Sequence, residues 1–113
     1  MSTRFEMVKE LIAEAHADEV GLWFVVARIR DEVGDADLHR LQRETLDCVD
    51  LMLASGDVSA GSYRPDGSGL ELWHRDRQDI LNRIADEWNK LGRIPDLGDI
   101  VVFVGRHGAT SLP

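Results

Sequence analysis

One stretch, residues 35–64, most constrains the fold, because it passes from an amphipathic helix into a strand with almost no linker. Its apolar residues between Leu38 and Ala54 recur at three- and four-residue steps, a spacing that predicts a helix with one buried stripe. Gly56 can adopt the positive φ that closes a helix, and the short run Val58–Tyr63 is typical of a strand. The fold must therefore accommodate a helix that leads directly into a strand.

The flanking segments predict three more helices and two more strands. Asp18 and Asp76 are good N-caps, and the helix that follows Asp18 is the most apolar one, so we expect it, with Trp23, at the centre of the core. The last strand is apolar on both faces, which favours deep burial. The expected elements are helices over 4–16, 18–33 and 76–91, and strands over 70–73 and 100–104.

This order of elements predicts an α+β fold: a winged-helix-like helical domain with a small antiparallel sheet and an inserted helix before the last strand. The chain has 113 residues, which suits a single domain with its own core. We expect an outer N-terminal helix in residues 1–17, the winged-helix-like core in residues 18–104, and a flexible tail in residues 105–113.

The charge of the chain bears on the class of partner. Its formal net charge is −8, whereas nucleic-acid binding draws much of its affinity from Lys and Arg side chains that replace phosphate counterions. The same acidic field would attract a basic protein and speed its association. No apolar run is long enough to span a membrane, and the N-terminus has no apolar signal core, so we expect a cytoplasmic protein without a membrane partner.

No combination of residues predicts catalysis. Residues 106–110 match the Arg-His-Gly signature of histidine phosphatases, but one His and one Arg lack the positioning that phosphoryl transfer requires. The four histidines show no metal-ligand spacing, and Cys48 lies on the apolar stripe, where we expect it buried and inert. We therefore expect no enzyme, no cofactor and no metal site.

Two features could bind a partner. The helix from Leu38 carries Glu44, Asp47 and Asp50 on its polar face, and Asp57 follows just past its end. These carboxylates are either an ordinary solvated face or a patch for the Lys and Arg side chains of a partner. Trp73, next to a glycine-rich turn, is the best candidate for a partly exposed aromatic anchor.

The same helix also permits a nucleic-acid interpretation. In a winged helix that binds DNA it would enter the major groove, where Arg, Asn and Gln side chains are expected. Its first half offers Arg40, Gln42 and Arg43, and Arg64 lies in the following turn. Its second half would instead bring Asp47 and its neighbours against phosphates, which is repulsive.

Three segments carry a family resemblance. At residues 45–56, 84–88 and 91–100 the chain resembles small acidic bacterial proteins with a winged-helix-like core, some of which resemble toxin-immunity proteins. The resemblance implies a non-enzymatic acidic protein-binding domain, an immunity-type protein that neutralises a basic toxin domain. The alternative is a winged-helix, DNA-associated transcriptional regulator.

Overall fold

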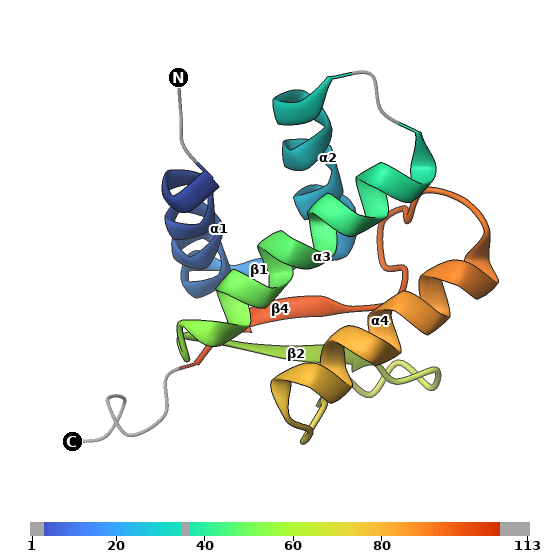
Figure 1. Cartoon of the computed structure of the whole chain (residues 1–113). Coiled ribbons are helices and arrows are strands. Elements are labelled where there is room, and N and C mark those ends of the chain that lie inside the picture. The colour runs from blue at the N-terminus through green and yellow to red at the C-terminus, as the bar shows by residue number, and fades with distance from the viewer. Residues whose placement is uncertain (1–3, 35–36, 107–113) are drawn as a thin grey trace.

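The computed structural model describes residues 4–34 and 37–106, which form four helices and one four-stranded antiparallel sheet (Figure 1). The predicted α+β class is therefore confirmed. The elements in chain order are α1 (Arg4–Ala17), β1 (Glu19–Gly21), α2 (Leu22–Val33), α3 (Leu38–Ala54), β2 (Val58–Tyr63), β3 (Leu70–Leu72), α4 (Arg77–Leu91) and β4 (Val102–Gly105).

Local capping signals set the ends of α3 and α4. The Asp37 side chain accepts a hydrogen bond from the Arg40 backbone N–H at 2.7 Å, and the Asp76 side chain accepts one from Asp79 at 2.9 Å. Gly56 follows α3 with a φ of 77°, so the helix closes and β2 begins two residues later. The predicted passage from a long helix into a strand is confirmed.

The start of α2 differs from the prediction, because Asp18 does not cap a helix there. Residues 19–21 form β1, and Gly21 occupies the N-cap position of α2 without a side-chain hydrogen bond. Val20 lies opposite Phe103 of β4 and is only 2% exposed. This burial within the sheet stabilises the extended conformation that a three-residue strand could not hold alone.

The sheet has the strand order β1-β4-β2-β3, so the last described strand lies between the first two. The strand begins at Val102 rather than Ile100, because Ile100 has a φ of 67°, outside the β region. It ends at Gly105, so the tail predicted from residue 105 begins at least one residue too early. Residues 107–113 lie outside the described ranges.

The helices pack together around one core. Helix α3 crosses the molecule between α1 and α4, and it also contacts α2 and β2 (Figure 1). Helix α1 packs against α3 and β4 through buried Met7, Val8, Leu11 and Ala15. Within the described ranges no helix is long and apolar enough to cross a membrane. The core residues include Val26, Ile29, Val49, Ile84, Val101 and Phe103, each at most 1% exposed.

Candidate functional site

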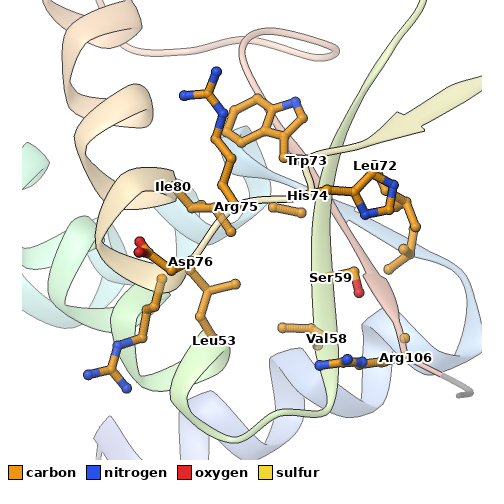
Figure 2. Close-up of a pocket in the computed structure, with 14 residues that line it drawn as sticks. Leu53, Val58, Ser59, Leu72, Trp73, His74, Arg75, Asp76, Ile80 and Arg106 are labelled. Carbon is orange, nitrogen blue, oxygen red and sulfur yellow. The ribbon is translucent and has the colours of Figure 1, made fainter.

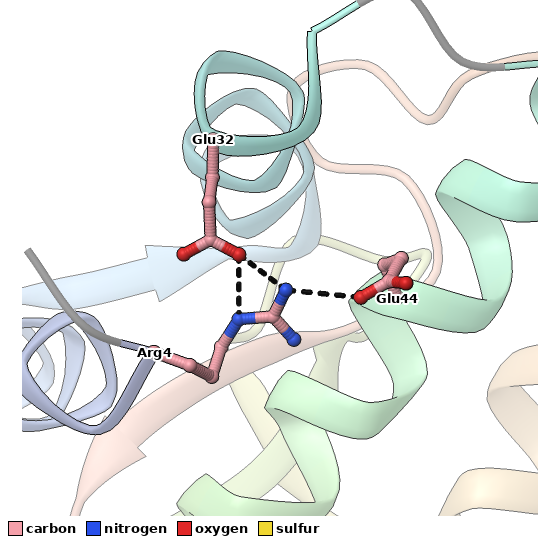
Figure 3. A network of polar contacts seen from close by, with 3 residues as sticks. All are labelled: Arg4, Glu32 and Glu44. Carbon is pink, nitrogen blue, oxygen red and sulfur yellow. Dashed lines mark hydrogen bonds and ion pairs between the residues drawn. The ribbon is translucent and has the colours of Figure 1, made fainter.

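Glu44, the first of the predicted docking carboxylates, is engaged inside the fold. The Arg4 guanidinium lies between Glu32 of α2 and Glu44 of α3, and it donates to Glu44 Oε1 at 3.0 Å (Figure 3). The hydrogen bond to Glu32, followed by that to Glu44, raises the pKa of Arg4 above its ordinary value against the opposing effect of burial. This cluster ties α1, α2 and α3 together, so Glu44 has a structural partner.

The remaining carboxylates near α3 have different surroundings. Asp50 Oδ1 lies 2.9 Å from Nε of Arg77, an ion pair that joins α3 to α4. Asp47 and Asp57 are exposed and form no ion pair with a described residue, and the Asp57 carbonyl accepts a hydrogen bond from the Arg106 N–H. Two of the three predicted carboxylates on α3 are thus paired with arginines of other helices.

Trp73 is buried, so the prediction of a partly exposed anchor at this position is wrong. Its side chain is 7% exposed, and its indole N–H donates to Ser62 Oγ at 3.0 Å. The Arg83 guanidinium covers the ring at 3.9 Å from the centroid. The glycine-rich turn before β3 is exposed, but Trp73, which follows β3, is covered by a side chain of α4.

A different surface, at the β1 end of the sheet, combines exposed apolar side chains with carboxylates. It is a hollow of about 520 Å³, which we call the acidic hollow. Trp23 is 38% exposed, Tyr63 50% and Leu97 76%, high values for such large apolar residues. The lining residues are Glu14, Asp18, Glu19, Val20, Gly21, Trp23, Phe24, Tyr63, Leu97, Gly98 and Val102.

The hollow depends on two contacts within the fold. Gly21 has no Cβ, and one placed there would lie 2.6 Å from Cδ1 of Trp23, so glycine allows the indole to lie against β1. The Tyr63 hydroxyl donates to Glu19 Oε2, which joins β2 to β1 across β4. This hydrogen bond raises the pKa of Tyr63 above its ordinary value. The side chains of the hollow are thus held by the sheet.

Sequence reasoning missed the acidic hollow. Trp23 was expected at the centre of the core, whereas the neighbouring Leu22, Val25 and Val26 are the buried residues of that helix. Glu14 and Asp18 come from the end of α1 and the residue after it, while Tyr63 comes from β2. Only the pairing of β1 with β4 brings these segments together, and the sequence pattern predicts a helix over residues 18–33, where β1 lies.

A second hollow of about 670 Å³ lies between the end of α3, the β3–α4 connection and the end of β4 (Figure 2). Its basic lining residues are His74, Arg75, Arg77 and Arg106, and we call it the basic groove. In Figure 2 the Arg75 and Arg106 side chains lie at opposite ends of the groove. Arg77 is paired with Asp50 of α3. The cations therefore do not converge on one anion.

The structure adds little to the catalytic and metal predictions. Among residues 4–34 and 37–106, no cluster of three His, Cys, Asp or Glu side chains could hold a metal ion. Cys48 is fully buried, as predicted, and burial is the main cause that raises its pKa to about 11. Of the phosphatase-like motif, Arg106 is exposed, whereas residues 107–110 lie outside the described ranges.

Comparison with protein-family models, with curated proteins and with solved structures found no match to this chain. The resemblance to small acidic immunity-type proteins therefore stays a prediction.

Proposed function

We propose that this protein is a non-enzymatic, cytoplasmic domain that binds a basic protein partner through the acidic hollow. The observation that carries the proposal is the exposure of Trp23, Tyr63 and Leu97 on a surface that also holds three carboxylates. The proposed docking surface therefore lies at the β1 end of the sheet, and not on the α3 face that the sequence predicts.

The exposed aromatic residues and the carboxylates of this surface both suit protein binding. Exposed Trp and Tyr side chains dominate the binding energy of many protein interfaces, because they bury a large area at a low entropic cost. The carboxylates of Glu14, Asp18 and Glu19, within a chain of net charge −8, would attract a positively charged partner and speed its association. The combination favours a partner with apolar and basic residues side by side.

Among such proteins, we favour an immunity-type role, in which the domain neutralises a basic toxin domain. Affinity capture from the source cells would identify the partner, and the complex would then be reconstituted from purified components. Reversing the charges of Asp18 and Glu19 to Lys should weaken the complex at least tenfold, mainly by slowing association, and salt should reduce the loss.

A matched control uses Asp47 and Asp57, which are exposed and unpaired among the described residues. Reversing both to Lys changes the net charge equally but leaves the acidic hollow intact, so the affinity should fall far less. A larger loss in this control than in the hollow variant would return the docking surface to α3. A partner without basic character would overturn the proposal.

The second candidate, a winged-helix DNA-associated regulator, is supported by the arrangement of α2 and α3. These helices pack together, and Arg40 and Arg43 are exposed on α3, while Arg64 is exposed in the β2–β3 turn. Titration against a random-sequence duplex at two salt concentrations separates the candidates. Tight, salt-sensitive binding by the wild type would favour the regulator, and no binding at low salt would exclude it.

A further inference from the structure

We infer that the acidic hollow receives a single arginine side chain of the partner, held between aromatic surfaces and carboxylates. This inference rests on the proposed function and specifies the chemistry of the contact. It starts from the composition of the lining, where the described residues include three carboxylates but no Lys, Arg or His.

None of the three carboxylates of the acidic hollow is paired with a described cation, whereas two of the three on α3 are. On α3, Glu44 and Asp50 are each paired with an arginine of the same chain. In the hollow, Glu14, Asp18 and Glu19 form no ion pair with a described residue, and the Glu19 carboxylate accepts a hydrogen bond from the Tyr63 hydroxyl. A carboxylate has further acceptor sites after one such hydrogen bond. These carboxylates are exposed, so a cation from outside the described chain could reach them.

The aromatic lining provides a second reason for a cationic ligand. Trp23, Phe24 and Tyr63 all line the hollow, and the Trp23 and Phe24 rings meet edge to face with centroids 5.7 Å apart. A cation near the face of an aromatic ring is attracted by the ring quadrupole, most strongly by tryptophan. The aliphatic stem of the same side chain would cover the exposed apolar surface of Leu97.

Arginine fits this combination better than lysine does. Its planar guanidinium stacks on aromatic faces and donates two parallel hydrogen bonds to a carboxylate, whereas the lysine ammonium is a compact, strongly hydrated charge. The hollow of about 520 Å³ has room for one such side chain with part of the flanking backbone. Much of its lining belongs to strands β1, β2 and β4 and to the ends of α1 and α2, and a preformed surface lowers the ordering cost of binding.

The test compares two short peptides with the full chain: one carries an arginine between leucines, and its twin carries citrulline, a neutral isostere. NMR titration gives the affinities, and tryptophan fluorescence reports the site, because Trp23 is exposed while Trp73 and Trp88 are buried. We expect the arginine peptide to bind at least tenfold more tightly and to change the Trp23 fluorescence. Trp23→Leu, and Asp18→Asn with Glu19→Gln, should each lose most of this preference, whereas Asp47→Asn should retain it.

Each other outcome overturns the inference in a recognisable way. Equal binding of both peptides with a response at Trp23 would show an apolar docking site without cation recognition, and the proposed function would stand. A preference for arginine that survives the Trp23 and Asp18/Glu19 variants would place the cation elsewhere. If neither peptide binds, recognition of a single side chain is wrong, and the reconstituted partner complex decides the proposed function independently.

Discussion

The α3 face and the acidic hollow carry similar numbers of carboxylates, yet they differ in what those carboxylates contact. On α3, Glu44 binds Arg4 and Asp50 pairs with Arg77, so both charges are used to join helices. In the hollow, Asp18 and Glu19 lie beside exposed aromatic side chains instead. The comparison shows that the folded chain uses most of the carboxylates of one acidic surface for its own ion pairs and leaves those of the other without a described cation.

This difference depends on tertiary contacts. Arg4 lies 28 residues from Glu32 and 40 residues from Glu44 along the chain, so no local pattern relates them. A helix face that looks solvated and acidic in sequence can therefore be largely neutralised after folding.

Replacing Phe103 with Ala should have the largest effect, because its strand, β4, pairs with both β1 and β2. Its side chain is fully buried in the strand between β1 and β2, so the loss of packing should cost about 3–5 kcal/mol in the free energy of unfolding. Urea denaturation followed by circular dichroism measures the change. A cost below about 1 kcal/mol would contradict the central position of β4.

Gly105→Ala should push α1, which carries residues of both regions, away from the sheet. Helix α1 carries Arg4 at its start and Glu14 near its end, and a Cβ at Gly105 would lie only 2.8 Å from Cα of His16. Because this neighbour is backbone, the helix must shift, at a cost of about 1–3 kcal/mol. Thermal or urea unfolding tests the value, and an unchanged stability would contradict the close packing of α1 on β4.

Arg4→Met isolates the α3 face. Without the Arg4 guanidinium, Glu32 and Glu44 lie side by side with no cation between them. Since both are partly exposed, we expect the free energy of unfolding to fall by about 1 kcal/mol, and this loss should shrink in high salt. The neutralising pair Asp18→Asn and Glu19→Gln should instead leave stability within about 0.5 kcal/mol of the wild type. Equal losses in the two variants would remove the distinction between the regions.

Gly21→Ala acts on the acidic hollow alone. The added Cβ would meet the indole of Trp23, which is partly exposed and free to move aside, so stability should change by less than about 0.5 kcal/mol. The displaced indole should alter the Trp23 fluorescence and its quenching by iodide. A large loss of stability would mean that the indole is fixed by its surroundings more firmly than its exposure suggests.

The smallest expected effect concerns one hydrogen bond. Tyr63 is the sole tyrosine of the chain, so absorbance titration of the phenol reports this residue alone. The bond to Glu19 favours the protonated phenol and raises its pKa, so it is intact below the ordinary phenol pKa and is lost as the pH rises through the raised value. Glu19→Gln should bring the pKa back towards 10, and an unchanged titration would contradict the contact.

Local signals explain which parts of the fold could be predicted from sequence. Asp76 and Gly56 mark helix ends through hydrogen bonds and backbone angles that involve only nearby residues, so α3, β2 and α4 follow directly. The buried positions Val49 and Ile84 follow from helical spacing in the same way. These features need no knowledge of distant parts of the chain.

The candidate site could not be predicted, because it depends on distant parts. Strand β1 exists only through its pairing with β4, and its three residues are too few to show a strand pattern. Trp23 and Trp73 are both apolar aromatics near glycines, and only the packing of the sheet decides that the first is exposed and the second buried. Glu44 and Asp50 likewise looked available until the folded chain supplied their arginines.

The position of β4 also has a consequence for the order of folding. Glu19 in the first strand pairs with Val104 in the last described strand, so β1 must wait for β4 before it finds a partner. Such long-range pairing is slow, because the loop entropy is lost before the contact forms. During synthesis, the surface around Trp23 would therefore form only after β4 has left the ribosome and can pair with β1. The acidic hollow would thus form later than contacts between elements that are adjacent in the sequence.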